Sequence, residues 1–275
     1  MSSPAEAYLR DYHRRLPGVT ARDFGSTPVW RDGEVHPSSY ALLEAEVPRG
    51  EAPQVVLDLA CGDGHLLEML ARRGQPGLTL MGIDMSEHEL AAAQERLKGA
   101  ATLTLGRAQA LPFPDASVDL VLSHLAFMLM DDVETVLSEL HRVLKPAGRV
   151  SMVIGGGSIR SAAFDQYLRL LRPLLASLPN PPRPLGDPRV RTEEGLTELF
   201  GDFSALHIQN LDVQCDGPPE HVWSSLTRTY DGDRLSAPAR DALKVDFLRA
   251  VEPLRFANGT LPFQWSMRQV TATRR

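Results

Sequence analysis

The feature of this sequence that most constrains its fold is a series of short apolar runs that alternates with amphipathic segments between Gln54 and Ile154. Buried parallel strands produce near-continuous apolar runs, and the helices that cross between them place apolar residues at i, i+3 and i+4. The predicted strands cover residues 55–59, 78–83, 101–105, 118–123 and 149–154, and the predicted crossover helices cover residues 66–73, 87–98 and 133–144. This alternation predicts an α/β fold with a doubly wound, mostly parallel sheet.

The flanking sequence predicts further helices and two more strands. The helical patterns cover residues 5–15, 38–46, 161–178, 193–200, 219–230 and 237–250, and the strand patterns cover residues 205–213 and 263–273. Pro173 lies within one helical pattern and is expected to kink or break that helix. We expect residues 1–50 to form a helical lid segment and residues 51–275 to form one α/β domain, with a cap inserted at about residues 156–202.

Charge and cysteine content limit the partners that this chain can have. The 275 residues carry a formal net charge of −6, whereas nucleic-acid binding relies on clustered Lys and Arg. No stretch approaches the length of a membrane span, and the first fifteen residues lack the apolar core of a signal peptide. Cys61 and Cys215 are too few for a disulfide framework or a thiolate metal site. We expect a cytoplasmic protein with no metal, no nucleic-acid partner and no membrane partner.

The strongest local signal is the stretch from Val56 to Gly64, VLDLACGDG, in which a predicted strand runs into a glycine-containing turn and then a helix. Glycine allows a ligand to lie directly against the backbone. Asp84 ends the next strand, where doubly wound folds place an acid that accepts hydrogen bonds from ribose hydroxyls. Asp84 could instead cap the following helix, but Ser86 can fill that role.

A dinucleotide site would carry the pattern G-x-G-x-x-G and a helix N-terminus that receives a pyrophosphate. Here Asp63 lies between Gly62 and Gly64, and there is no third glycine. A carboxylate repels a diphosphate but attracts the cationic end of a ligand. The turn therefore favours an adenosyl ligand with a sulfonium and an ammonium group over a nicotinamide dinucleotide.

Five motifs follow one another over roughly residues 54–154. They are VLDLACGDG (56–64), GIDMS (82–86), ALPFPD (110–115), SVDLV (117–121) and RVLKPAG (142–148). In this order they resemble the class I S-adenosylmethionine-dependent methyltransferases, specifically the small-molecule branch that includes the quinone-biosynthesis type. The resemblance implies a Rossmann-like domain with a seven-stranded sheet in the order 3-2-1-4-5-7-6, an antiparallel strand 7, and S-adenosylmethionine as the cofactor.

The resemblance also implies which residues bind the cofactor. In chain order they are Tyr40, Asp58, Ala60, Cys61, Gly62, Gly64, Asp84, Met85, Arg107, Ala108, Gln109, Ser123 and His124. The backbone of the glycine turn would lie against the methionine portion, with Asp58 organising the turn. Asp84 would bind the ribose, and Met85 would pack on the adenine.

Four further expectations concern the edges of this site. Ala108 and Gln109 would flank the second adenine face. Arg107 stands where the family carries an acid that accepts a hydrogen bond from the adenine amino group. Since Arg has no acceptor, that contact is expected from Gln109 or from backbone carbonyls. Ser123 and His124 would line the pocket near the methyl group, and Tyr40 would reach the methionine carboxylate.

Catalysis by methyl transfer requires alignment of nucleophile and methyl group and the exclusion of water. His124 is the candidate catalytic residue, as a base for a hydroxyl or phenol nucleophile. A pocket residue that hydrogen-bonds to the backbone is the alternative reading of His124. Apolar and aromatic residues expected at the substrate are Phe127, Met128, Phe164, Tyr167 and Trp223.

Two functions remain open at this point. The first is methyl transfer to a small, partly apolar or aromatic metabolite, with O-methylation favoured. The alternative is a protein of the same fold that binds S-adenosylmethionine but has lost methyl transfer, and binds a ligand or catalyses a rearrangement. In either case we expect a monomer or a homodimer.

Overall fold

The computed structural model describes residues 3–156 and 161–275. These residues form two compact units, which are described separately. The sheet unit contains the described residues up to Gly156 together with Leu185–Leu211 and Met267–Arg275. The helical unit contains residues 161–184 and Asp212–Ser266. The expected cap at 156–202 is thus bounded differently, because residues 185–202 belong to the sheet unit and a second, C-terminal segment belongs to the helical unit.

A single β-sheet organises the sheet unit. Its strands are β1 (Val29–Arg31), β2 (Glu34–His36), β3 (Gln54–Leu59), β4 (Leu78–Asp84), β5 (Thr102–Leu105), β6 (Val118–His124), β7 (Leu144–Gly155), β8 (Phe203–Gln214) and β9 (Gln264–Arg274). Over the described ranges the sheet has nine strands, in the order β2-β1-β8-β9-β7-β6-β3-β4-β5. The expected number of seven is therefore wrong, because two short strands precede the others.

The two unpredicted strands form a hairpin within the expected lid segment. β1 pairs antiparallel with β2, with Trp30 opposite Val35. Asp32 and Gly33 connect them with φ values of 53° and 83°, a backbone that Asp-Gly sequences favour in two-residue hairpin turns. The Asp-Gly pair was the available sequence signal, but strands of three residues are too short to show a periodic pattern.

The C-terminal ends of three parallel strands, β3, β4 and β6, lie at one edge of the sheet. β3 pairs in parallel with β4, with Leu59 opposite Ile83, and it also pairs in parallel with β6. β7 continues the parallel set beside β6, whereas β9 runs antiparallel to β7. The last residues of β3, β4 and β6 are Leu59, Asp84 and His124. In open α/β sheets, ligands bind at this carboxyl edge.

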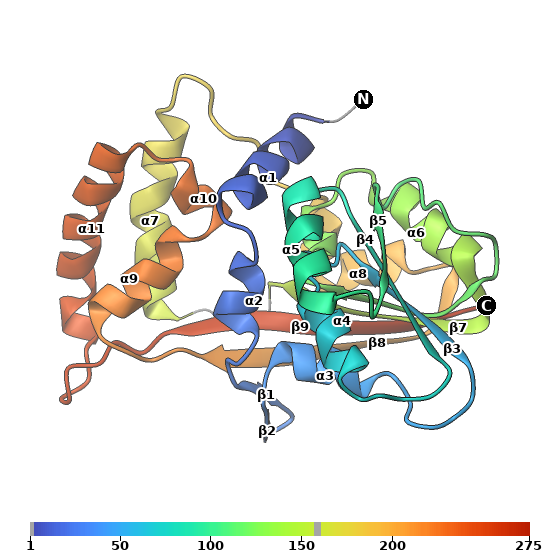
Figure 1. Ribbon diagram of the computed structural model, residues 1–275. Helices are drawn as coiled ribbons and strands as arrows, with labels where there is room; N and C mark the ends of the chain where they lie inside the picture. Colours follow the sequence, from blue (N-terminus) through green and yellow to red (C-terminus); the bar gives the residue numbers. More distant parts are fainter. Residues whose placement is uncertain (1–2, 157–160) are drawn as a thin grey trace. The chain divides into compact units, whose positions relative to one another are not determined.

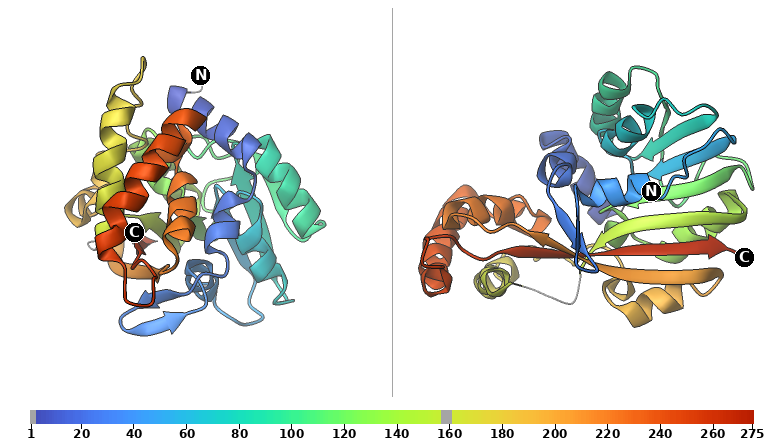
Figure 2. Two further views of the ribbon diagram at one scale, coloured as in Figure 1. Left: turned by 90° about the vertical axis from the view of Figure 1, so that its left-hand side faces the viewer. Right: turned by 90° about the horizontal axis from the view of Figure 1, so that it is seen from below.

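Helices cover both faces of the sheet. Those of the sheet unit are α1 (Pro4–Arg15), α2 (Val19–Phe24), α3 (Ser39–Ala45), α4 (His65–Ala71), α5 (Glu87–Leu97), η1 (Phe127–Leu129), α6 (Val133–Val143), η2 (Pro188–Arg191) and α8 (Glu193–Leu199). In the right-hand view of Figure 2, α4 and α5 lie on one side of the strands and α8 on the other. The buried core follows the same layers, with Leu57, Val121 and Val150 fully buried on the central strands.

Hydroxyl caps define the starts of the helices that border the carboxyl edge. Ser38 accepts a hydrogen bond from the backbone of Ala41 at the start of α3, and Ser86 accepts one from Glu89 at the start of α5. Ser3 and Glu6 form a reciprocal capping box at the start of α1. Helix α1 packs beside α5, as Figure 1 shows.

The helical unit has a hydrophobic core of its own. Its helices are α7 (Ala162–Ala176), α9 (Pro219–Thr227), α10 (Tyr230–Asp233), α11 (Ala237–Val251) and η3 (Glu252–Leu254). Tyr167, Trp223 and Phe247 meet edge to face or tilted in this core, with centroid separations of 5.6–6.2 Å. The expected break at Pro173 is wrong, because α7 continues to Ala176. Pro173 lies in the last turn of α7, so only the three residues that follow it could be displaced by a distortion of the helix.

Gly64 provides a test of how tightly α5 packs on the turn after β3. Its φ is +77°, and a Cβ there would stand 3.1 Å from Ala93 Cβ and 3.0 Å from Leu97 Cδ1. Gly74 has φ +55° but open space around it, so it serves as the control. Gly74→Ala should lower the free energy of unfolding by about 1 kcal/mol through strain alone, and Gly64→Ala by a further ~1–3 kcal/mol through overpacking. Urea denaturation measures both, and equal losses would contradict the packing argument.

Candidate active site

The turn that follows β3 holds a backbone open to a ligand. Ala60 and Gly62 have φ values of 58° and 51°, in the left-handed region. A Cβ on Gly62 would meet nothing nearer than Glu89 Oε2 at 4.0 Å, so space lies beside this residue. Gly64 differs, because its missing side chain makes room for α5 rather than for a ligand. Cys61, between Ala60 and Gly62, is buried, and its backbone N–H donates to Ile83 O at 3.0 Å.

Asp84 is fixed by the backbone on both sides of its carboxylate. Its Oδ2 accepts a hydrogen bond from Gly62 N at 2.9 Å, and its Oδ1 accepts one from Ser86 N at 2.8 Å. Each oxygen keeps further acceptor capacity. Burial raises the pKa of Asp84, although these two N–H groups oppose that rise. The arrangement suits recognition of a pair of vicinal hydroxyls, the role expected of Asp84.

Negative charge concentrates at the turn. Burial raises the pKa of the Asp58 carboxyl well above its ordinary value, and the charges of Asp84 and Asp63 raise it further. Burial likewise raises the pKa of the Cys61 thiol, which stays protonated at neutral pH. A cation bound beside Asp58 would relieve this repulsion.

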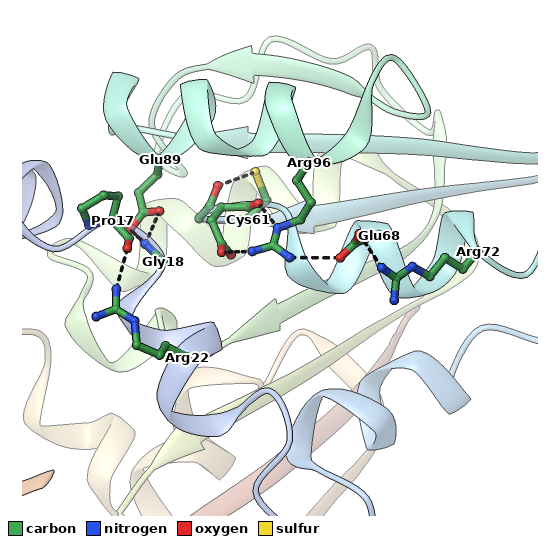
Figure 3. Close-up of polar contacts among 10 residues, drawn as sticks. Pro17, Gly18, Arg22, Cys61, Glu68, Arg72, Glu89 and Arg96 are labelled. Atoms are coloured by element: carbon green, nitrogen blue, oxygen red, sulfur yellow. Dashed lines mark hydrogen bonds and ion pairs between the residues drawn. The ribbon is translucent and has the colours of Figure 1, made fainter.

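Arg96 of α5 neutralises the acid inside the turn. Its guanidinium pairs with the Asp63 carboxylate, donates from Nε to Asp63 O at 2.9 Å and bonds to Glu68 at 3.0 Å. Figure 3 shows this guanidinium reaching toward Glu68. Asp63 therefore has a structural role in the turn.

The N-terminal segment is tied to the same site. Glu89, which is buried, accepts hydrogen bonds from Gly18 N at 3.0 and 3.2 Å and contacts His13 Nδ1 at 2.7 Å. Arg22 donates to Pro17 O at 3.1 Å, and Figure 3 shows Gly18 facing Glu89. Sequence reasoning missed Glu89, because an acid in the first turn of a helix is common for electrostatic reasons alone.

The expected adenine end lies at a hollow of about 430 Å³ between α1, the start of α5 and the end of β5. Met85, Leu105, Gly106 and Arg107 are among the residues that line it. Arg107 has a carboxylate partner, because its Nε donates a hydrogen bond to Glu6 Oε1 at 2.9 Å. Helix α1 thus brings a carboxylate to the position where Arg107 replaces the family's acid.

The residues next to Arg107 have structural partners. Gln109 Nε2 donates to Asp131 O at 2.6 Å, and Ala108 packs against the core of the sheet unit. The second amide atom of Gln109, its oxygen, has the acceptor chemistry that an amino group requires.

His124 lies in a buried cluster at the end of β6. Its Nε2 is 2.8 Å from Ser39 Oγ, and the Tyr40 ring stacks on the imidazole with a centroid separation of 3.6 Å. His65 meets the other edge of Tyr40 at 4.7 Å. Burial, and secondarily the charge of His65, lowers the pKa of His124 to about 3. A neutral imidazole with such a pKa is a poor proton acceptor at neutral pH, which weakens the general-base reading of His124.

The neighbours of His124 divide between core and surface. Ser123 is buried and its hydroxyl donates to Leu59 O at 2.9 Å, so it ties β6 to β3 instead of facing a ligand. Phe127 is 1% exposed and packs against Phe200 in the core of the sheet unit. Met128 is half-buried. The expectation that Phe127 forms a substrate wall is not what the structure shows, because the 3-10 turn η1 directs this ring into the core.

The expected substrate residues of the helical unit are also largely core residues. Tyr167 is 1% exposed and donates its hydroxyl hydrogen bond to Leu226 O at 3.2 Å, while Trp223 is 7% exposed. Phe164 is half-buried against Trp265. Among these three, Phe164 keeps the most surface for a ligand.

Arg142 explains why two of the five motifs occur together. Its guanidinium donates to Leu111 O and Phe113 O, each at 2.8 Å, and it also pairs with Glu139 and Asp115. The motif 142–148 therefore holds the loop of the motif 110–115 in place. These residues support the fold beside the site and do not face the site itself.

Two features are absent from the described ranges. Residues 3–156 and 161–275 contain no group of three or more His, Cys, Asp or Glu side chains arranged to hold a metal ion. No helix in those ranges has the length and apolar character needed to cross a membrane.

Comparison with known proteins gives a family match for one segment of the chain. Residues 57–152 match the model of the methyltransferase domain family. This segment contains the turn, Asp84 and His124. The match confirms the resemblance to methyltransferases that the motifs indicate.

Individual relatives differ in what they methylate. A demethylmenaquinone methyltransferase from Lactococcus lactis is 35% identical over 130 residues, which are 45% of this chain and 52% of the relative. A nocamycin O-methyltransferase from Saccharothrix syringae is 27% identical over 235 residues, 76% of this chain and 82% of the relative. The chain spans about half the length of the first curated relatives that it matches, between 39% and 52%.

A solved structure supports the fold assignment. Phosphoethanolamine N-methyltransferase 2 of Haemonchus contortus, in complex with S-adenosyl-L-methionine, superposes with a TM-score of 0.51 at 19% identity, covering 86% of this chain and 52% of that chain. The protein thus has the methyltransferase-like α/β fold with a mostly parallel central sheet.

The raised pKa of Asp58 predicts a pH-dependent stability. Because the folded-state pKa lies above the unfolded value, stability that Asp58 contributes below the unfolded pKa is lost as pH rises through the folded pKa. Asp58→Asn should therefore raise the free energy of unfolding near pH 8 and have no such effect near pH 4. Urea denaturation across this range measures the difference, with the exposed Asp202→Asn as the control. Destabilisation by Asp58→Asn at every pH would contradict it.

Gly18 should be required for docking of the N-terminal segment. Its φ is +65°, and a Cβ would stand 2.7 Å from Asp63 Oδ2. Gly18→Ala should raise amide hydrogen exchange over residues 4–24 by about tenfold, since strain and clash of this kind cost ~1–3 kcal/mol. Gly33→Ala is the control, with φ +83° and no atom within 4 Å of its Cβ. Similar exchange in the two variants would show that Gly18 does not limit docking.

Proposed function

We propose that this protein binds S-adenosylmethionine at the carboxyl ends of β3, β4 and β6 and transfers its methyl group to a small metabolite. The observation that carries the proposal is the fixed carboxylate of Asp84, held by Gly62 N and Ser86 N beside a turn with open space at Gly62. A carboxylate oriented in this way, next to a backbone that a ligand can approach, fits an adenosyl group.

The charges of the site fit a cationic ligand. The bound cofactor would supply an electrophilic methyl group on a sulfonium, and it also carries an ammonium group. Asp58, with its raised pKa, gains a partner when such a ligand binds. Met85 and the hollow beside Arg107 would receive the adenine, and Tyr40 is proposed to reach the methionine carboxylate.

The protein's own residues would mainly orient the reactants and exclude water. The N-terminal segment, held by Glu89 and by the pair of Glu6 with Arg107, would cover the cofactor. Cover of this kind limits water at the reacting atoms and preserves alignment.

For the methyl acceptor we propose a small, partly apolar or aromatic molecule, with an oxygen atom as the favoured nucleophile. The relatives named above are a demethylmenaquinone methyltransferase and a nocamycin O-methyltransferase. Because His124 is neutral with a pKa of about 3, an oxygen that ionises without help, such as a carboxyl, enol or acidic phenol, suits the site best. Met128 is the proposed apolar contact in the sheet unit.

The free cysteines and the net charge of the chain support a proposal for its cellular compartment and partners. Both cysteines are free thiols, which agrees with a reducing compartment. We propose that the protein acts in the cytoplasm as a monomer or homodimer, without nucleic acid. The net charge of −6 supports the last point.

Calorimetric titration with S-adenosylmethionine and with NADH tests the cofactor. We expect micromolar binding of S-adenosylmethionine alone, weakened at least about tenfold by Asp84→Asn, because an amide offers one acceptor oxygen where the site uses two. Asp202→Asn should bind like wild type. Thermal melting of each variant excludes unfolding as the cause, and failure of both S-adenosylmethionine and S-adenosylhomocysteine to bind would overturn the proposal.

Turnover separates the two functions that the sequence left open. Incubation with apolar carboxylic acids, enols and phenols should yield S-adenosylhomocysteine and a methylated product detectable by mass spectrometry. Cofactor binding without product from any acceptor class would favour a protein that has lost methyl transfer.

A further inference from the structure

The buried cluster around His124 contains an unpaired nitrogen. Within the part of the chain that the structure describes, His124 Nδ1 is buried and has no hydrogen-bond partner. Its other nitrogen, Nε2, is 2.8 Å from Ser39 Oγ, and both side chains are buried. A buried polar atom without a partner in a native protein requires an explanation, and a bound ligand is one.

The pair of Ser39 and His124 can be hydrogen-bonded in two ways. If Nε2 carries the proton and donates to Ser39 Oγ, the serine proton and the Nδ1 lone pair both lack partners. If the serine hydroxyl donates to Nε2, Nδ1 carries the proton, and that N–H and the acceptor sites of the serine oxygen lack partners. Ser39 Oγ has no other bond among the described residues, so both arrangements leave Nδ1 unpaired, and only the second presents it as a donor to a ligand oxygen.

We propose that Ser39 is a positioning residue that fixes His124 as its Nδ1–H tautomer, so that His124 donates a hydrogen bond to an oxygen of the bound ligand instead of accepting a proton from it. Stacking with Tyr40 holds the imidazole plane. This inference rests on the proposed ligand site, because the oxygen belongs either to the carboxylate of the cofactor or to the methyl acceptor.

The surroundings of the ring favour a neutral donor. Tyr40 and His65 are the titratable groups that face it, and neither offers a carboxylate that would stabilise an imidazolium. Burial, together with the charges of Asp63 and Asp58, raises the pKa of the Tyr40 hydroxyl, so Tyr40 also stays neutral beside the imidazole. A neutral N–H that points at an oxyanion stabilises it without any transfer of a proton.

Nitrogen-15 NMR of the ligand-free protein with labelled histidine measures the tautomer directly. We expect the His124 signals, assigned with His124→Asn, to show a protonated Nδ1 and an unprotonated Nε2, unchanged between pH 8 and pH 5. A protonated Nε2 would overturn the proposal, as would titration of His124 within that range. This measurement does not depend on cofactor binding, so it can fail or succeed separately from the proposed function.

Ser39→Ala and Ser38→Ala form a matched pair for the role of Ser39. Ser38 Oγ caps α3 through the Ala41 backbone and does not contact His124. Ser39→Ala should give a mixture of tautomers, whereas Ser38→Ala should lower thermal stability and leave the tautomer unchanged. An unchanged tautomer in Ser39→Ala would show that Ser39 does not set it.

Titration with S-adenosylhomocysteine and with its decarboxylated analogue identifies the oxygen. Asn places an amide N–H close to where His presents Nδ1–H, and Leu places none. If the oxygen is the cofactor carboxylate, His124→Leu should weaken S-adenosylhomocysteine at least tenfold, leave the analogue unaffected, and be rescued by His124→Asn. If the oxygen belongs to the methyl acceptor, both ligands should bind His124→Leu normally, and turnover should survive in His124→Asn but not in His124→Leu. Loss of turnover in both variants would mean that His124 is a base and would overturn the proposal.

Discussion

Two hydrogen bonds to the carboxylate of Asp84 connect the end of β4 to the turn after β3 and to the start of α5. Gly62 N and Ser86 N donate to its two oxygens, and both N–H groups come from segments that the sheet cannot satisfy. The turn is therefore held in a conformation with left-handed residues and with open space beside Gly62. The proposed contacts of the turn and of Asp84 with the cofactor depend on this junction.

Several acidic side chains lie near the same edge of the sheet. Arg96 pairs with Asp63, and His13 together with the Gly18 backbone occupies Glu89, but Asp58 stays buried with a raised pKa. Burial of a carboxyl in this way reduces the stability of the free protein at neutral pH. Such strain is common where a site is prepared for a ligand of opposite charge.

Much of the fold could be predicted because the parallel strands and crossover helices leave strong periodic patterns. The ranges predicted for β3, β4 and β6 differ from those observed by one residue at most at either end. The hairpin of β1 and β2 was missed because its strands are too short for a pattern. The cap expected at about 156–202 does not coincide with the helical unit, because that unit is built from two distant segments. The effect of Pro173 was overestimated because this residue lies in the last turn of α7, where little of the helix follows it.

The sequence by itself determined the class of the protein: the order of its five motifs, the glycine turn and the acid that ends β4 define a methyltransferase domain, since these depend on residue type and local spacing. Only the tertiary structure decided which side chains meet across long separations. It joined Glu6 to Arg107, Glu89 to Gly18 and Ser39 to His124, and it placed Phe127 and Tyr167 in cores. The physical reason is that pairing, burial and tautomer are set by neighbours in space, about which periodicity and spacing along the chain carry no information.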